Sequence, residues 1–130
     1  MGKKEKSGGF TLVEVLLATL IIAVAVVPLM DVFSRSTRWM VESRKAMTAL
    51  NLAQMVLEET SSVEYGELDG LAMTETAAFE EFPEYRYQLA VEDYPEGGGK
   101  KLVKRLKVTV YDGDTMKELV SLETDRGDWQ

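Results

Sequence analysis

The chain has 130 residues, carries a formal net charge of −7, and contains neither cysteine nor histidine. It can therefore form no disulfide and no thiolate metal site, and it lacks both the commonest general base and the thiol nucleophile of enzymes. The acidic balance argues against nucleic acid as a partner, because nonspecific binding needs clustered lysine and arginine. The length is that of one domain. The sequence also lacks a phosphate-binding glycine loop, and no enzyme activity is predicted.

A short basic leader precedes a long apolar stretch. Residues 1–9 read MGKKEKSGG, with three lysines and one glutamate, a net side-chain charge of +2. Residues 10–30 read FTLVEVLLATLIIAVAVVPLM and contain a single charged side chain, that of Glu14. A helix of these 21 residues reaches about 30 Å, the thickness of a bilayer's hydrocarbon core. Residues 10–30 are therefore predicted to form a transmembrane helix.

An ordinary secretory signal is the main alternative for this N-terminus. Such a signal has an apolar core of about 7–15 residues followed by small residues at the cut. Here the small residues Ala23 and Ala25 lie inside the apolar run, which continues beyond them. Removal of the whole apolar segment is therefore not expected.

Glu14 is the unusual residue of the predicted span. A carboxylate inside hydrocarbon costs about 2–3 kcal/mol on insertion scales, and less near an end where it reaches the interface. From its position alone, Glu14 either has a function within the membrane or marks the interfacial end of the span.

The residues before and around Glu14 resemble the processing site of type IV prepilins and pseudopilins. Gly8 and Gly9 are followed by Phe10, and Glu14 stands four residues further on, between a basic leader and an apolar helix. The resemblance implies that a prepilin peptidase cuts between Gly9 and Phe10 on the cytoplasmic face and methylates the new amine of Phe10. It also implies that Glu14 guides subunit alignment and incorporation.

The chemistry of such a site has a physical basis. Glycine before the cut lets the backbone lie extended in a protease cleft without a side-chain clash. A buried carboxylate needs a cationic partner, and the ammonium of Phe10 in an adjacent subunit is one that only assembly supplies. Phe10 and Glu14 of the same helix are one turn apart, so a pair within one subunit is the alternative.

Pro28 lies near the far end of the span, where it removes one helical hydrogen bond and favours a kink. Two interpretations remain open for it. Pro28 either marks the membrane exit or, as in many type IV pilins, breaks the helix when subunits pack into a filament.

The helical pattern continues in amphipathic form through residues 31–62, because apolar side chains recur at spacings of three, four and seven. One helix over residues 11–62 is expected, with an apolar stripe that needs a covering layer. The stripe consists of Met40, Ala46, Met47, Leu50, Ala53, Val56 and Leu57. Within it, residues 51–59, NLAQMVLEE, resemble a segment of I-type minor pseudopilins of type II secretion.

The helical period is lost over residues 61–83, where Gly66, Asp69 and Gly70 indicate turns. The acidic run at residues 75–81 has no clear period either. A surface loop with a short helical piece is predicted here, and such a loop can carry partner specificity. Phe79 and Phe82 either anchor this loop or form an exposed contact.

The remainder predicts three strands in an antiparallel meander. The first begins at Tyr85 and ends before Pro95 and a hairpin loop at glycines 97–99. The second covers residues 102–110, and a turn at residues 112–114 leads into the third, around residues 117–124. In the second strand, side chains expected to point inward are Leu102, Leu106, Val108 and Val110, and those expected to point mostly outward are Lys104, Arg105, Lys107 and Thr109.

One face of this sheet is expected to cover the apolar stripe of the helix. The fold class is therefore α+β, and the resemblance implies a type IV pilin-like fold. Asp112, Asp114 and Glu118 suggest calcium, but they offer too few oxygens and lack the spacing of an EF-hand. No cofactor is predicted.

The sequence thus favours a minor pilin or pseudopilin precursor, in which residues 1–9 are removed and residues 10–30 form the membrane helix and later the filament core. Residues 31–62 are the amphipathic half of that helix, and residues 63–130 form a head outside the cytoplasm of a bacterium. Expected partners are the prepilin peptidase, other pilin subunits, an inner-membrane assembly platform driven by a separate ATPase, and lipid before assembly. The expected location is the inner membrane and then a periplasmic or extracellular filament.

Two alternatives belong to other classes of protein. A single-span anchor displaying a ligand-binding or sensor domain would keep its leader. A membrane-tethered hydrolase would need a pair of carboxylates in a cleft.

Overall fold

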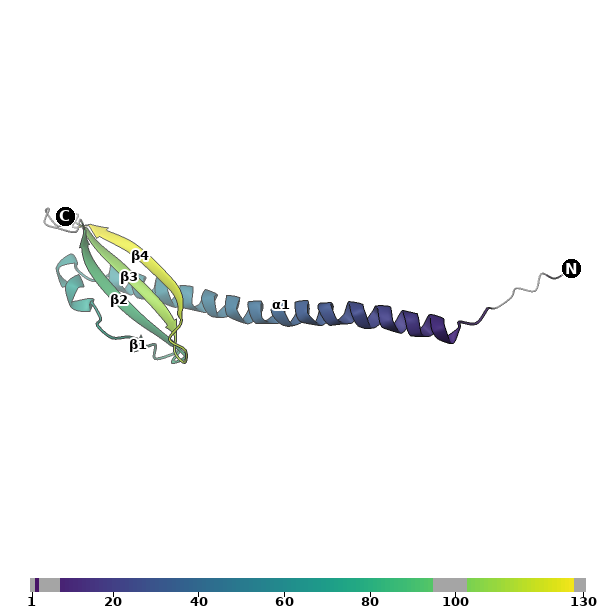
Figure 1. Cartoon of the computed structure of the whole chain (residues 1–130). Coiled ribbons are helices and arrows are strands. Elements are labelled where there is room, and N and C mark those ends of the chain that lie inside the picture. Colours follow the sequence, from purple (N-terminus) through teal and green to yellow (C-terminus); the bar gives the residue numbers. More distant parts are fainter. Residues whose placement is uncertain (1, 3–7, 95–102, 128–130) are drawn as a thin grey trace. The chain divides into compact units, whose positions relative to one another are not determined.

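The computed structural model describes residues 2, 8–94 and 103–127 of the chain (Figure 1). Its elements in chain order are the helix α1 (Leu12–Ser61), the 3₁₀ helix η1 (Tyr65–Leu71), and the strands β1 (Ala77–Ala78), β2 (Tyr85–Tyr94), β3 (Val103–Asp112) and β4 (Glu118–Gly127). The chain divides into two compact units, Met1–Val41 and Glu42–Gln130, and α1 contributes to both. The lysines of the leader, Pro95, the hairpin loop predicted at glycines 97–99, and Leu102 lie outside the described residues.

In the first unit, α1 is apolar on all its sides. Every leucine, isoleucine, valine, methionine and phenylalanine from Leu12 to Phe33 is exposed, including Leu12 at 77% and Phe33 at 72%. By length and composition this helix is able to cross a membrane. A helix that is apolar all round needs an apolar environment, and lipid or other helices can supply it.

Pro28 lies inside α1, and the helix continues through it. Proline has no backbone N–H, so the carbonyl of Val24 loses its helical donor. The flanking residues nevertheless remain helical, and the structure shows no helix break at Pro28 in the single chain. Breakage of the helix on assembly remains a prediction.

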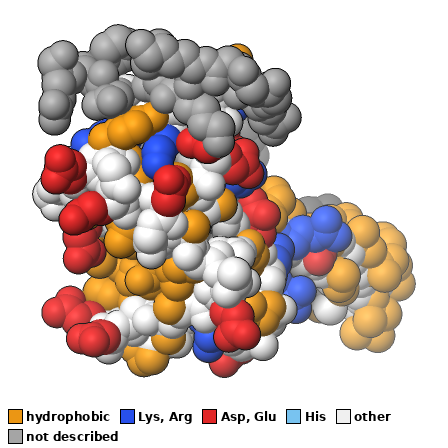
Figure 2. All heavy atoms as spheres, turned by 90° about the vertical axis from the view of Figure 1, so that its left-hand side faces the viewer, with side chains coloured by type: hydrophobic (Ala, Val, Ile, Leu, Met, Phe, Trp, Pro, Cys, Tyr) orange, Lys and Arg blue, Asp and Glu red, His pale blue; other side chains and the backbone are white. Residues whose placement is uncertain are grey.

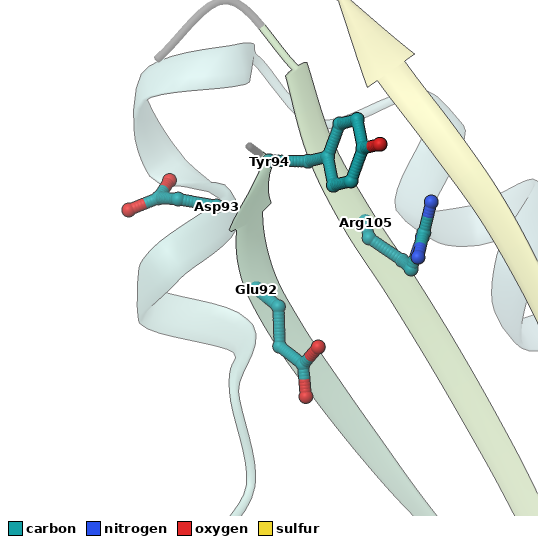
Figure 3. Close-up of a pocket in the computed structure, with 4 residues that line it drawn as sticks. All are labelled: Glu92, Asp93, Tyr94 and Arg105. Atoms are coloured by element: carbon teal, nitrogen blue, oxygen red, sulfur yellow. The ribbon is translucent and has the colours of Figure 1, made fainter. Parts of the chain in front are cut away.

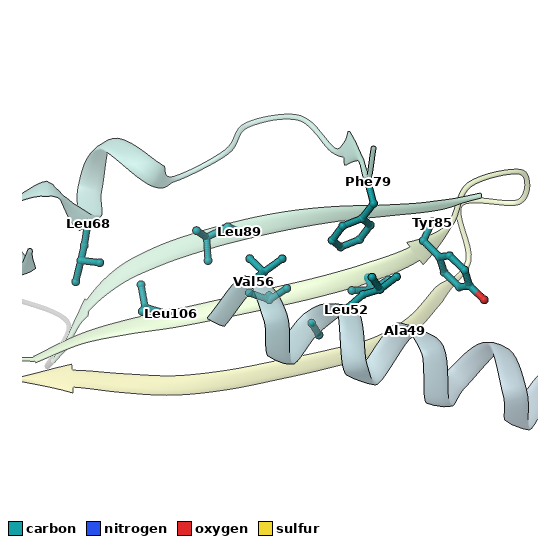
Figure 4. Packing of buried hydrophobic residues seen from close by; sticks show 11 residues of the cluster. Ala49, Leu52, Val56, Leu68, Phe79, Tyr85, Leu89 and Leu106 are labelled. Atoms are coloured by element: carbon teal, nitrogen blue, oxygen red, sulfur yellow. The ribbon is translucent and has the colours of Figure 1, made fainter. Parts of the chain in front are cut away.

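The second unit packs residues 42–61 of α1 on a four-stranded antiparallel sheet of order β1-β2-β3-β4. From here on, the head means this whole unit, which adds the end of α1 to the head predicted at residues 63–130. The predicted α+β arrangement is confirmed. Figure 4 shows side chains from the helix, from η1 and from the sheet meeting between the layers. The core consists of Ala49, Leu52, Ala53, Val56, Leu68, Phe79, Tyr85, Leu89, Leu106, Val108 and Val110.

The sheet follows from alternating side chains. Leu106, Val108 and Val110 of β3 are fully buried, and β2 pairs with β3 so that Leu89 lies opposite Val108 and Tyr85 lies opposite Asp112. In β4, Leu122 lies opposite Val108 and completes the same inner face. The outer face carries cross-strand ion pairs instead, as expected for an antiparallel sheet with one face in water.

The sequence predicted three strands, and the structure has four. The additional strand, β1, has only two residues and lies in the acidic run that was predicted to be a loop. Two residues are too few to show an alternating pattern, which explains why β1 was missed. The short helical piece predicted in this region is η1, and Phe79 beside β1 is a buried anchor whose ring lies 4.5 Å from that of Tyr87.

The apolar stripe of the helix was assigned partly to the wrong residues. Met47 is 64% exposed and Met40 is 59% exposed, whereas the buried positions of α1 are Ala49, Leu52, Ala53, Val56 and Thr60. Each residue turns the helix by about 100°, so Met47 lies about 200° round from Ala49 and faces away from the sheet. Small alanines on the buried side allow the sheet to approach the helix closely.

Lys104 and Thr109 are both buried and were both predicted to point mostly outward, and that prediction is wrong for Lys104. Lys104 lies on the inner face two residues from Leu106, and its amine reaches the exposed carboxylate of Asp69 and lies 5.0 Å from the centre of the Tyr65 ring. The long lysine stem allows this, because it passes along apolar surface while the charge stays near the rim. Thr109 faces outward, but its hydroxyl lies 3.4 Å from that of Ser121 on β4.

Polar contacts connect the helix to the sheet at both ends of the head. Near the turn that joins β3 and β4, the amine of Lys45 donates to Oδ2 of Asp112 at 2.7 Å. The other carboxylate oxygen of Asp112 accepts the backbone N–H of Thr115 at 3.0 Å. At the C-terminal end of α1, Arg126 of β4 donates to the carbonyl of Ser61 at 2.6 Å. The last turn of α1 has no basic residue of its own, so Arg126 supplies the cation that a helix C-terminus favours.

The turn after β3 also approaches the segment before β2. The N–H of Gly113 donates to the carbonyl of Glu84 at 2.7 Å, and a Cβ at position 113 would lie 2.9 Å from that oxygen. Only glycine allows this approach, so the turn predicted at residues 112–114 is confirmed with a specific reason for its central residue.

Leu106→Ala should destabilise the head by about 2–5 kcal/mol, because it leaves a cavity in a fully buried site. Met55→Ala is the matched control, since Met55 is 50% exposed and its truncation leaves no enclosed space. Hydrogen exchange of the β3 amides in the detergent-solubilised full-length chain measures the difference. Equal protection in the two variants would contradict the packing described for the head.

Asp112→Asn should lower the stability of the head at neutral pH and flatten its dependence on acid pH. The hydrogen bond from Lys45, together with that from Thr115, holds the pKa of Asp112 well below its ordinary value. The unfolded chain therefore binds the proton first, so the stability that Asp112 supplies is present above about pH 4 and is lost as the pH falls from there toward the folded pKa.

Hydrogen exchange between about pH 3 and pH 7 tests this expectation, once corrected for the intrinsic exchange rate. Asp125→Asn is the comparison, because Arg105 lowers the pKa of Asp125 on the exposed outer face, where solvent screens the pair. An unchanged pH dependence in Asp112→Asn would remove the assigned role of the Lys45 contact.

Candidate functional site

The candidate site is the segment in which α1 begins. Residues 8–11 are not helical, and α1 starts at Leu12. The hydroxyl of Thr11 accepts the N–H of Glu14 at 3.2 Å, and the carbonyl of Thr11 accepts the N–H of Val15 at 3.2 Å. Thr11 is therefore the N-cap, and threonine followed three residues later by glutamate is the capping-box pattern. No role was predicted for Thr11 from the sequence, although this spacing is a signal that could have identified it.

The predicted scissile bond lies in exposed, non-helical chain. Gly8 and Gly9 are exposed, and Phe10 is 84% exposed. A Cβ built on either glycine meets no atom within 4 Å. The fold of this chain therefore gives no reason for glycine at position 9, and any requirement for it must come from the enzyme that binds the segment.

Glu14 lies in the first turn of α1 and is exposed. A carboxylate is favoured there by the partial positive charge at a helix N-terminus. Among the residues that the structure describes, the Glu14 carboxylate has no ion-pair or hydrogen-bond partner. The described residues therefore offer this carboxylate no cation, and a new amine at Phe10 is one that processing would supply.

The comparisons with known proteins address this segment. Residues 5–30 match the family model of the prokaryotic N-terminal methylation motif, the signature of type IV prepilins and pseudopilins. The chain carries the type IV prepilin signature. The match includes Gly9, Phe10, Glu14 and Pro28. No curated protein and no solved structure matches the chain.

The motif has consequences for the rest of the chain. It implies processing by a prepilin peptidase and assembly with other pilins, and together with the apolar helix it indicates membrane anchoring. Proteins with this motif are structural subunits rather than enzymes. The long apolar helix and the antiparallel sheet of the head are consistent with the type IV pilin-like fold.

The carboxylates near the turn after β3 do not gather into a metal site. Asp112 is occupied by Lys45, by the backbone of Asp114 and by Thr115. In the described ranges, no group of three or more acidic side chains is placed to hold a metal ion.

A hollow of about 300 Å³ lies where β2 ends and β3 begins, lined by Glu92, Asp93, Tyr94 and Arg105 (Figure 3). Glu92 and Asp93 are adjacent in a strand, so their carboxylates point to opposite faces and do not converge on one point. Arg105 donates to Asp125 at 2.9 Å and lies 4.9 Å from the centre of the Tyr94 ring. The contacts of Arg105 in this hollow are therefore an ion pair and a ring contact on the outer face of the sheet. The two carboxylates do not form a catalytic pair.

The head is strongly acidic. Residues 42–130 contain 19 acidic and 10 basic side chains, a formal charge of −9. Figure 2 shows acidic side chains spread over the visible face of the head, with apolar side chains exposed between them. This surface is suited to contacts with proteins rather than to the phosphate backbone of nucleic acid.

Proposed function

We propose that the chain is a minor pilin or pseudopilin precursor. It is cut between Gly9 and Phe10, methylated at the amine of Phe10, and assembled as a structural subunit of a type IV pilus or of a type II secretion pseudopilus. The observation that carries this proposal is the methylation motif over residues 5–30, which leads directly into a helix long enough to span a membrane.

The geometry around the cut supports processing. A peptidase needs extended backbone, and residues 8–11 are non-helical and exposed. Because the N-cap is Thr11, cleavage after Gly9 leaves the first helical turn intact and places the new ammonium one residue before the cap. The product is a helix with a cation at its start and a carboxylate one turn further on.

The unpartnered carboxylate of Glu14 supports assembly. In lipid, a lone carboxylate near the hydrocarbon is costly, and a neighbouring subunit that offers its Phe10 ammonium lowers that cost. The pairing becomes available only when subunits lie side by side. Glu14 thus selects the aligned arrangement over other ways of packing the same apolar helices.

The exposed apolar surface of α1 fits a helix that is covered first by lipid and later by other subunits. Before assembly lipid covers residues 12–33, and in the filament the helices of other subunits cover them. Association of apolar helices depends on close packing and on polar pairs, since lipid is as apolar as the helix surface. The short head and the likeness of residues 51–59 to I-type pseudopilins support a minor subunit.

Mass spectrometry of the protein from its native cells is the deciding experiment. A mature chain that begins at N-methylated Phe10 supports the proposal. A chain that retains residues 1–9 would instead support a single-span membrane anchor that displays its head.

Gly9→Val should block processing and leave the precursor in the membrane. The structure shows no atom near a Cβ at position 9, so the block reflects the peptidase cleft and not misfolding. Gly8→Val has the same open surroundings and should still be cut, while Gly9→Ala should be tolerated. Immunoblotting for the two chain lengths in cells that express the peptidase measures the outcome, and normal cleavage of Gly9→Val would place the cut elsewhere.

Glu14→Ala should leave cleavage largely intact and strongly reduce incorporation into filaments. The Glu14 side chain has no partner among the described residues, so its removal costs that part of the chain no ion pair or side-chain hydrogen bond. Glu42→Ala, at another exposed acid of α1, is the matched control and should assemble normally. Quantifying both variants in sheared filament fractions tests this role, and equal incorporation would remove Glu14 from assembly.

A further inference from the structure

The part of α1 that follows Met30 carries a group of exposed side chains that neither the head nor the processing site uses. Arg35 pairs with Asp31 at 3.0 Å, one helical turn away. Arg38 is exposed and has no ion pair or hydrogen bond within the described part of the chain. Trp39 beside it is 70% exposed. We call Asp31, Arg35, Arg38 and Trp39 the exit collar.

The apolar surface of the helix does not end at Asp31. Val32 is 64% exposed and Phe33 is 72% exposed, and Phe33 lies in one row with Val26, Leu29 and Met30 along the helix surface. Asp31 interrupts this surface, but its charge is balanced by Arg35 within the same helix. The apolar surface therefore extends at least to Phe33.

The length of this surface sets its depth in a bilayer. Residues 15–33 span about 29 Å at the helical rise, which matches a hydrocarbon core of about 30 Å. In this register Glu14 lies just outside one edge, and the ion pair of Asp31 and Arg35 spans the other, with Asp31 two residues inside it and Arg35 two residues beyond. Trp39 is six residues beyond Phe33, so its Cα lies about 9 Å along the axis, just past a headgroup layer of about 5–8 Å.

The direction of the side chains brings the collar back toward the membrane. In a helix each Cα–Cβ bond tilts toward the N-terminus, and for α1 beyond Phe33 that is the side on which the hydrocarbon lies. Long arginine side chains and the indole ring can therefore reach back into the headgroup layer. Tryptophan is enriched at this depth, and the guanidinium fork matches a phosphate oxygen pair.

We propose that the exit collar binds phospholipid headgroups, with the guanidinium of Arg38 on lipid phosphate and the ring of Trp39 at the interface. The collar fixes the far boundary of the span after Phe33, about one turn beyond Met30. Asp31 does not oppose this, because Arg35 neutralises it. The proposal rests on the membrane-inserted form of the proposed function, and it assigns the collar to lipid rather than to a second copy of the chain.

The test uses the full-length chain in phospholipid vesicles that contain anionic lipid. The chain has two tryptophans, so Trp129→Phe leaves Trp39 as the only one. Its fluorescence is compared with lipids brominated near the headgroup, with lipids brominated deep in the acyl chain, and with a water-soluble quencher. We expect the strongest quenching from the shallow bromines and partial shielding from the water-soluble quencher.

Two further variants make the result specific. Met55→Trp in a chain with Trp39→Phe and Trp129→Phe places the probe on an exposed site of the head and should respond to the water-soluble quencher alone. Arg38→Gln should reduce quenching of Trp39 by the shallow bromines, whereas Arg44→Gln, at the next exposed arginine, should leave it unchanged.

Several outcomes would overturn the proposal. Trp39 that responds only to the water-soluble quencher stands in water, and quenching strongest from the deep bromines places it inside the hydrocarbon. Shielding that grows with the protein-to-lipid ratio would assign the collar to contacts between copies. Flotation with the vesicles separates these results from a failure of the proposed function, because a chain that does not float with lipid would overturn membrane insertion itself.

Discussion

The structure depends on one uncovered surface. Between Leu12 and Phe33, α1 exposes apolar side chains in every direction, and no described part of the chain covers them. Exposing apolar surface to water costs about 25 cal/mol of free energy per Å². This segment of the chain therefore needs lipid or other helices around it. In the first unit, the charged residues of α1 lie near the two ends of this apolar surface. Thr11 begins the helix, Glu14 places one charge at its start, and Asp31 with Arg35 places a neutral pair near its end.

The head is a small sheet packed on one helix, and without cysteine it is held together by packing and polar contacts alone. Its core is made by alanines and branched side chains of α1 against the inner face of β2, β3 and β4. Polar contacts then fix the two ends of the same helix segment. Lys45 connects it to the turn after β3, and Arg126 of β4 donates to the carbonyls where α1 ends. These contacts tie the C-terminal strand to the helix that carries the processing site.

The processing segment shows how a site for another enzyme can be kept apart from the fold. The two glycines make no close contact, and the helix begins only after Thr11, so a cut before Phe10 leaves the hydrogen bonds that begin α1 in place. The segment thus offers an exposed, non-helical backbone and, within the described part of the chain, a carboxylate without an ion-pair partner.

The sequence by itself determined the apolar span, the methylation motif that contains Gly9, Phe10 and Glu14, the α+β class and the positions of three long strands. These features are written in local patterns, namely uninterrupted hydrophobicity, fixed spacing and alternation of side chains. Only the tertiary structure decided which residues of α1 face the sheet, because the helix is so rich in apolar residues that its stripe could be drawn through Met47 as well as through Ala49. It also decided that Lys104 is buried, since its partner Asp69 lies 35 residues away in the chain, and that β1 exists, since two residues become a strand only when β2 lies beside them.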